Sequence, residues 1–195
     1  MILSQQDARV RRITLADPQR RNILNAAMAR QLLTELAAAE ADPNTGAILI
    51  NAEGPVFCAG LDFDDPPEEA IFTFGTRATK PIVAAMQGVA TSAGVALLAN
   101  AHIVIAAQGS SFGLTDIREG RIHKGVLSAV ESVLGQRRTR EIALTGRIFT
   151  TPDALNWGLV HAATPAFELE DRVSATAHGL AGANPDAVRA VLSRA

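Results

Sequence analysis

The sequence predicts an α/β fold in a single domain that spans residues 1–195. Short apolar runs alternate along the chain with segments of helical periodicity, a pattern typical of mostly parallel sheets whose strands are connected by helices. The apolar runs do not alternate cleanly with polar residues, which indicates strands that are covered on both faces. A length of 195 residues suits one domain with one sizeable core.

The predicted strands are short and rich in aliphatic residues. In chain order they are 10–15, 47–51, 81–86, 102–107 and 158–163. The longest helix is predicted over 26–40, because apolar residues recur there at three- and four-residue spacing and Asp42-Pro43-Asn44 then ends the run. The apolar positions of that helix are Met28, Leu32, Leu36 and Ala39.

Shorter signals predict the remaining helices. These are 93–101, 125–134, 138–144, a helix that begins at Thr151, 168–180 and 185–193. Thr151 is expected to cap its helix, with Pro152 at the first helical position. The acidic, proline-bearing stretch 64–69 is expected to form a loop at the mouth of a site.

The composition excludes several classes of function. Lys and Arg number 18 against 20 Asp and Glu, and no basic block stands out, so nucleic acid is not an expected partner. Cys58 is the only cysteine, which excludes a disulfide within the chain and a multi-cysteine metal site, and no histidine pair suggests a metal. The first residues lack the pattern of a secretion signal, and the apolar runs are too short to span a membrane. We therefore predict a cytoplasmic protein with no membrane association and no bound metal.

Two turns of very small residues carry the strongest functional signal. The runs 56–62 and 87–94 each read as a buried apolar strand that ends in such a turn. Small residues let a backbone N–H group approach a ligand that a larger side chain would block. Two turns of this kind can aim two N–H donors at one point and form an oxyanion hole, and the second turn also opens a predicted helix.

Six segments, spread over nearly the whole chain, match known motifs in order. They are Arg20-Arg21-Asn22-Ile23-Leu24-Asn25, Phe57-Cys58-Ala59-Gly60-Leu61-Asp62, Lys80-Pro81-Ile82-Val83-Ala84-Ala85-Met86-Gln87-Gly88, Phe112-Gly113-Leu114-Thr115-Asp116, Leu144-Thr145-Gly146-Arg147 and Ala154-Leu155-Asn156-Trp157-Gly158-Leu159-Val160. The first is similar to a K/R-x-N-A-L-N turn, the second to F-C-A-G-x-D, the third to K-P-V-I-A-A-V-N-G, the fourth to F-x-x-P-E, and the last two to L-T-G and A-x-x-x-G-L-V. By these motifs the chain resembles the enoyl-CoA hydratase/isomerase family, also called the crotonase superfamily.

The resemblance implies a spiral of repeated β-β-α units that assembles as a homotrimer or hexamer. It implies an acyl-CoA or acyl-carrier-protein substrate, no tightly bound cofactor, and an enolate held by the backbone N–H groups of Leu61 and Ala93. Lys80 also suits phosphate contact by its charge. The residues that the resemblance places near coenzyme A are Arg20, Arg21, Asn22, Leu24, Ala59, Leu61, Asp62 and Phe63.

The same resemblance identifies the candidate base. Family hydratases use two glutamates, and the matching positions here are Ala96 and Asp116, so only one carboxylate remains and it is one methylene shorter. One base with an oxyanion hole favours an isomerase over a hydratase, with Asp116 carrying the proton. The competing interpretation is that the Asp-x-x-Glu spacing of Asp116 and Glu119 forms a helix capping box. Glu119 is the reserve base.

Two neighbours complete the list of candidate catalytic residues. Lys124 could pair with Asp116 or hold a substrate carboxylate, and His123 could act as an acid or base near neutral pH. The competing interpretation, which applies to such residues more often, is that both lie on the surface. Cys58 is interpreted as a small buried residue and not as a nucleophile. The phenylalanines Phe72 and Phe74 could touch an acyl chain.

Alternatives to the isomerase remain open. Hydration, decarboxylation or carbon–carbon hydrolysis could occur in the same pocket, and a non-catalytic relative could bind acyl-CoA without turning it over. Two departures from the family pattern accompany these alternatives. The stretch 62–80 is short where family members form a helix beside the acyl pocket, and the usual C-terminal helical extension is expected to be largely absent, which would leave the site more open to water.

Overall fold

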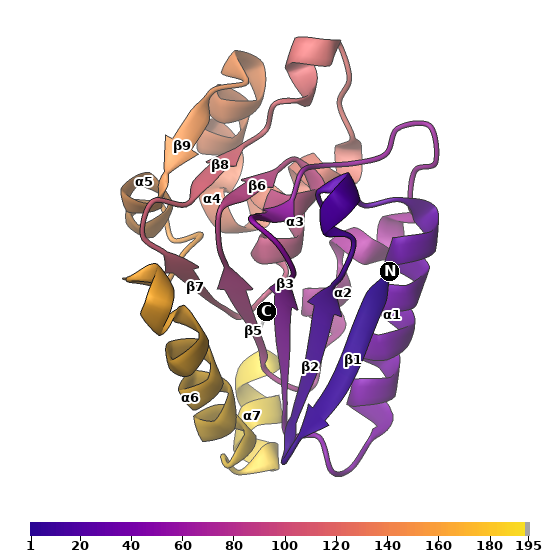
Figure 1. Ribbon diagram of the computed structural model, residues 1–195, viewed down its shortest axis with the longest axis vertical. Helices are drawn as coiled ribbons and strands as arrows, with labels where there is room; N and C mark the ends of the chain where they lie inside the picture. The colour runs from indigo at the N-terminus through magenta and orange to yellow at the C-terminus, as the bar shows by residue number, and fades with distance from the viewer. Residues whose placement is uncertain (194–195) are drawn as a thin grey trace.

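Two sheets, one above the other in the view of Figure 1, organise the chain. The structure is a computed structural model, and it describes residues 1–193. The larger sheet has the strand order β1-β2-β3-β5-β7-β10, and the smaller has the order β4-β6-β8-β9. Their bounds are β1 Ile2–Asp7, β2 Val10–Leu15, β3 Ala47–Ala52, β4 Val56–Cys58, β5 Ile82–Met86, β6 Val89–Thr91, β7 Ile103–Ala107, β8 Ser111–Gly113, β9 Ile148–Thr150 and β10 Ala162–Thr164.

The strands between β3 and β8 come in consecutive pairs, and each pair contributes one strand to each sheet. The first strands, β3, β5 and β7, pair in parallel in the larger sheet, and the second strands, β4, β6 and β8, pair in parallel in the smaller one. A helical segment follows each pair, as α1 follows the antiparallel hairpin β1–β2. The predicted spiral of β-β-α units is thus visible in the chain order itself.

The helices differ widely in length. The α-helices are α1 Ala26–Ala41, α2 Phe74–Arg77, α3 Ala93–Ala99, α4 Lys124–Thr145, α5 Thr151–Asn156, α6 Leu169–Ala181 and α7 Pro185–Leu192. Four short 3-10 helices join them: η1 Pro18–Arg20, η2 Glu69–Phe72, η3 Asp116–Glu119 and η4 Ala166–Glu168. No helix in the part of the chain that the structure describes is long and apolar enough to cross a membrane.

The central strands of the larger sheet, β3, β5 and β7, are buried on both faces, which explains why they do not alternate between apolar and polar residues. In β5, Val83 and Ala85 pack with Val173 of α6, whereas Ala84 and Met86 join the main core on the opposite face. Successive side chains of a strand point to opposite faces, so two covers require a continuous apolar run. The prediction of strands covered on both sides is confirmed.

Several boundaries differ from the sequence prediction. The strand predicted over 158–163 is wrong, because Gly158 adopts a left-handed φ of 83° in a turn and β10 begins only at Ala162. The two helices predicted over 125–134 and 138–144 form one element, α4, which is interrupted at Gly135 (φ 71°, ψ 158°). Gly135 lies in the gap between the two predicted helices, at residues 135–137.

The predicted cap at Thr151 is also wrong by one residue. Thr150 caps α5: its backbone N–H donates to Asp153 Oδ2 at 2.9 Å, and its hydroxyl accepts from the Asp153 N–H at 3.4 Å. Thr151 is buried, and its hydroxyl donates to the carbonyl of Ser110 at 3.0 Å. A pair of adjacent threonines gives the same local cap signal, and tertiary burial decides between them.

Candidate active site

The Leu61 loop follows β4 and is tied to the chain turn that begins at Arg20. Ala59 N–H donates to the Arg21 carbonyl at 3.0 Å, Leu24 N–H donates to the Gly60 carbonyl at 2.9 Å, and Asp62 N–H donates to the Leu24 carbonyl at 2.9 Å. The two segments that the sequence predicts to lie near coenzyme A therefore form one unit.

Asn22 holds the first of these segments in place. It is fully buried with a left-handed φ of 53°, a conformation that Asn tolerates better than most residues. Its amide donates to the carbonyls of Glu53 and Val56 at 3.0 and 2.8 Å, and its oxygen accepts from the Asp17 N–H at 2.8 Å. The side chain thus satisfies three backbone groups, and this bonding fixes the turn on which Arg20 and Arg21 lie.

The second small-residue turn lies between β6 and α3, at Ser92. Ser92 has φ 49° and ψ −112°, and its N–H donates to the Gly113 carbonyl at 2.8 Å. A Cβ atom on Gly94 would lie 2.6 Å from the Cys58 carbonyl oxygen, and one on Gly60 would lie 3.5 Å from Ser92 Cβ. These close approaches show that the Leu61 loop and the Ser92 turn touch each other.

The N–H groups of Leu61 and Ala93 are free of partners in residues 1–193, since neither donates a hydrogen bond there. Leu61 follows Gly60, and Ala93 follows Ser92, so both amides come directly after the point where the two turns meet. Buried N–H groups are nearly always paired in folded proteins. Two unpaired donors at one contact are a site that can accept an oxygen atom from a ligand.

Asp116 reaches the same turn from the unit formed by β7, β8 and α4. It is the first residue of η3 after β8, and its carboxylate Oδ2 accepts a short hydrogen bond from the Ser92 hydroxyl. The competing capping-box interpretation is wrong, because Thr115 occupies the cap position and no side-chain cap bond forms. Burial raises the pKa of Asp116 and the charge of Glu119 raises it further, while the Ser92 bond and His123 oppose this shift.

The other predicted acid–base residues surround Asp116 without bonding to it. Glu119 is exposed at the end of η3. The His123 ring packs on Phe72 with 4.9 Å between centroids, and its Nε2 lies 3.8 Å from Glu69 Oε1. His123 Nδ1 is buried and has no partner among the described residues. The predicted pairing of Lys124 with Asp116 is wrong, because Lys124 is exposed and forms no ion pair within residues 1–193.

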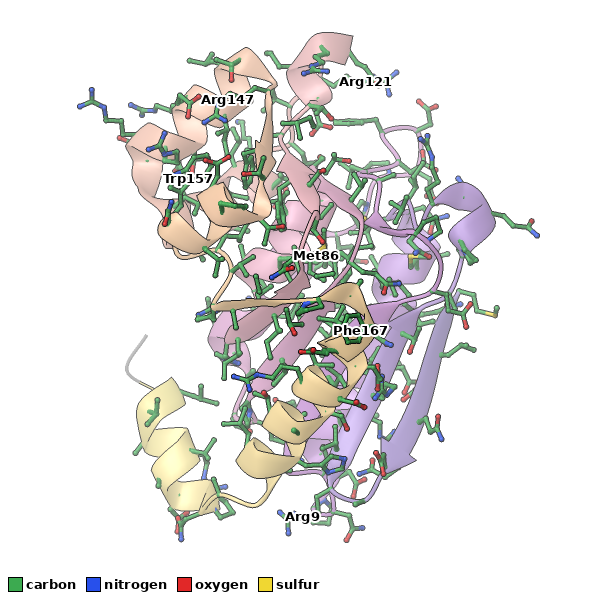
Figure 2. All side chains as sticks on the ribbon, turned by 60° about the vertical axis from the view of Figure 1, so that its left-hand side comes forward. Arg9, Met86, Arg121, Arg147, Trp157 and Phe167 are labelled. Carbon is green, nitrogen blue, oxygen red and sulfur yellow. The ribbon has the colours of Figure 1, made fainter. Side chains whose placement is uncertain are left out.

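Two arginines connect the loops at this end of the molecule. The Arg121 guanidinium carbon lies 5.2 Å from the centre of the Phe63 ring, and the Arg121 N–H donates to the Asp116 carbonyl at 3.0 Å. Arg20 Nη2 pairs with Asp62 Oδ2 at 3.0 Å. Figure 2 shows Arg121 at the end of the molecule opposite Arg9.

Other sequence-predicted residues have structural roles. Cys58 is fully buried, and burial raises the pKa of its thiol to about 12, which confirms its interpretation as an inert core residue. Lys80 Nζ donates to the carbonyls of Ala39 and Asp42 at 2.6 Å each, so it caps the end of α1 and does not serve a phosphate. Phe72 is buried in the core, and so is Phe74.

Ser92 is the residue of the site that sequence reasoning missed. It lies inside the small-residue run 87–94, where the size of the residues is the signal and the hydroxyl adds none of its own. A serine between a strand and a helix, two residues before Gly94, was the available signal. Among residues 1–193, no group of three or more His, Cys, Asp or Glu side chains is arranged to hold a metal ion.

Repeated β-β-α units with two touching small-residue turns and a partly buried carboxylate define a protein of the crotonase-fold class. A solved enoyl-CoA hydratase from Mycobacterium avium superposes with a TM-score of 0.88 and 36% identity, and the match covers 98% of this chain and 85% of that one. Human enoyl Coenzyme A hydratase domain-containing protein 3 superposes with a TM-score of 0.92 and 25% identity, over 98% of this chain and 81% of that one.

The sequence comparison narrows the class to a family. Residues 5–194 match the enoyl-CoA hydratase/isomerase family, to which the chain belongs. The mevalonyl-coenzyme A hydratase of Aspergillus fumigatus is 30% identical over 92% of this chain and 72% of its own length. The predicted family and the predicted fold are thereby both confirmed.

Proposed function

We propose that the protein binds an acyl thioester of coenzyme A and isomerises its double bond through an enolate. The backbone N–H groups of Leu61 and Ala93 would hold the thioester oxygen, and Asp116 would carry the proton. The observation that supports this proposal best is the hydrogen bond from Ser92 to Asp116, because Ser92 directly precedes Ala93. A carboxylate bonded there lies beside any carbonyl oxygen that accepts a hydrogen bond from the Ala93 N–H.

The chemistry follows from the weak acidity of a thioester α-proton. As Asp116 removes that proton, the electron pair of the C–H bond moves into the carbonyl and negative charge forms on its oxygen. Each well-placed oxyanion donor contributes roughly 10²–10³ in rate, and a positioned base contributes about 10²–10⁴. The raised pKa of Asp116 favours this role, since a proton carrier works best when its pKa approaches the working pH. Returning the proton to the γ-carbon completes the isomerisation.

Ala96 is the reason to prefer an isomerase over a hydratase. It is fully buried on α3 among apolar residues, so no carboxylate stands where the family resemblance expects the first glutamate. Adding water needs a group that positions and activates it, whereas moving a proton between two carbons needs only one carboxylate. Decarboxylation and carbon–carbon hydrolysis are the alternative reactions of the same oxyanion site.

The coenzyme A phosphates are proposed to lie on the turn that Asn22 anchors. Arg21 is exposed there, and its guanidinium suits bidentate phosphate contact. Arg21→Ala should weaken coenzyme A binding about tenfold, as expected for a hydrogen bond to a charged group. Isothermal titration measures the effect, with the exposed Arg172→Ala as control; equal affinity in the two variants would remove Arg21 from the site.

A homotrimeric or hexameric assembly, an acyl-carrier-protein substrate and a cytoplasmic location stay predictions.

Exchange of α-protons in heavy water tests the proposal without knowledge of the natural acyl group. Protein is incubated with a panel of enoyl- and acyl-CoA thioesters, and deuterium uptake is followed by mass spectrometry. Asp116→Asn should slow uptake by about 10²–10⁴-fold, whereas Asp171→Asn on exposed α6 should not change it. Uptake that survives in Asp116→Asn moves the base to Glu119 or His123. Binding with no uptake favours a non-catalytic acyl-CoA-binding relative.

A further inference from the structure

Ser92 occupies a sharp strand-to-helix elbow. β6 ends at Thr91 and α3 begins at Ala93, so the chain passes from strand to helix within the single residue Ser92, at φ 49° and ψ −112°. Non-glycine residues rarely adopt positive φ, and such conformations gather at functional sites. An elbow of this kind presents a nucleophilic serine in α/β enzymes, where the N–H of the following residue is an oxyanion donor.

The Ser92 hydroxyl already has the partner that a nucleophile needs. A serine hydroxyl is weakly nucleophilic until an adjacent base accepts its proton. Here the hydroxyl donates directly to Asp116 Oδ2, so the carboxylate is poised to take that proton. Burial raises the pKa of Asp116, which makes its ionised form a stronger base. The elbow, the base and the N–H of the following residue, Ala93, are therefore together at one place.

We propose that Ser92 is a nucleophile toward acyl thioesters, which gives the protein a thioesterase activity through an acyl-serine intermediate. This inference rests on the proposed function, because it uses the same carbonyl position between the N–H groups of Leu61 and Ala93. It differs in the atom attacked: the base takes the serine proton and not the α-proton of the substrate.

The steps balance with water as the only co-reactant. Ser92 Oγ bonds to the thioester carbonyl carbon while its proton moves to Asp116, and the resulting oxyanion lies on the two N–H groups. The C–S bond then breaks, the sulfur takes the proton from Asp116, and coenzyme A leaves as a thiol. Water next attacks the serine ester and gives a proton to Asp116. The C–Oγ bond breaks, the proton returns to Ser92, and the acyl group leaves as a carboxylic acid.

Burial of Ser92 is consistent with this role. Ser92 is 1% exposed and its neighbour Ala93 is 0% exposed. Any opening that lets a thioester oxygen reach the Ala93 N–H also brings its carbonyl carbon to the preceding residue. Exclusion of bulk water from such a site strengthens the interactions that hold a developing oxyanion.

The test measures thiol release and covalent labelling on the same samples as α-proton exchange. The protein is mixed with acetyl-CoA, butanoyl-CoA or crotonyl-CoA. Free thiol is followed, and quenched samples are digested to locate an acyl mass. A fluorophosphonate probe labels activated serines independently of the acyl group. Ser92→Gly is the informative variant, because glycine accepts positive φ and keeps both backbone N–H groups. Ser132→Ala, on the exposed face of α4, is the matched control.

We expect an acyl mass or phosphonyl label on the peptide that contains Ser92, with label and thiol release lost in Ser92→Gly and kept in Ser132→Ala. Asp116→Asn should slow release by about 10²–10⁴-fold. A label that persists in Ser92→Gly overturns the inference. Proton exchange without label or thiol release also overturns it and leaves the proposed isomerase intact. Label without exchange supports Ser92 and ends the isomerase proposal, and the absence of both overturns both.

Discussion

Gly94→Ala tests whether close contact between the two turns is required for activity. A Cβ atom at this position would lie 2.6 Å from the Cys58 carbonyl oxygen, whereas ordinary contacts begin at 3.4 Å. Relief of the clash requires the end of β4 and the start of α3 to separate by about 0.8 Å. Because Leu61 and Ala93 follow these two segments, the same separation would move apart the two N–H groups that are proposed to hold one oxygen. A displacement near 1 Å can cost about 10² in rate.

Deuterium uptake from heavy water measures that rate, and urea unfolding measures stability. We expect uptake to fall about 100-fold and the free energy of unfolding to fall by about 1–3 kcal/mol, the cost typical of overpacking. Gly179→Ala is the control: an added Cβ there meets nothing within 4 Å, so it should raise stability by up to about 1 kcal/mol and leave uptake unchanged. Folded Gly94→Ala protein that exchanges at the wild-type rate would refute the reasoning.

Three further predictions concern single side chains. Because burial raises the pKa of Asp116, the folded state favours its neutral form and loses stability as pH rises through that pKa. Asp116→Asn should therefore be more stable than wild type at pH 7. Urea titrations should show that the difference in free energy of unfolding between the two proteins disappears in acid. Asn22→Ala removes the side-chain partner of the Glu53 and Val56 carbonyls and of the Asp17 N–H, and should cost roughly 3 kcal/mol. Exposed Asn156→Ala should cost almost nothing by the same titration. Cys58, the only thiol, has a pKa of about 12, so a disulfide reagent should not react with native protein and should titrate one thiol in urea; reaction with the native protein would contradict its burial.

The strands that the sequence predicts well are those buried on both faces. β5 and β7 are continuous aliphatic runs, and their boundaries agree with prediction to within a residue. In the smaller sheet, the runs 56–62 and 87–94 predict β4 and β6, whereas β8 and β9 escape prediction because each is three residues long, too short to display a period. β1 escapes as well, because it lies at the sheet edge and exposes five of its six residues.

The candidate site, like the fold, can be predicted from the sequence only in part. Local composition indicates the two turns, since small residues mark both, and the family resemblance implies Leu61 and Ala93 as the donors within them. The bond between Ser92 and Asp116 joins positions 24 apart in sequence. It depends on how the unit that contains β5 and β6 packs on the unit that contains β7 and β8, which no local pattern encodes. Lys80 shows the converse error, because a charge that suits phosphate proves to be held by the carbonyls at the end of α1.

Each of the three chemical groups of the candidate site belongs to a different β-β-α unit of the spiral. Leu61 follows the strand β4, Ala93 follows β6 and Asp116 follows β8, and these three strands are neighbours in the smaller sheet. A change of length or sequence in one unit can therefore replace one group, while the smaller sheet keeps the other two in their positions. Such independence explains how a single architecture can be re-equipped for new reactions one residue at a time.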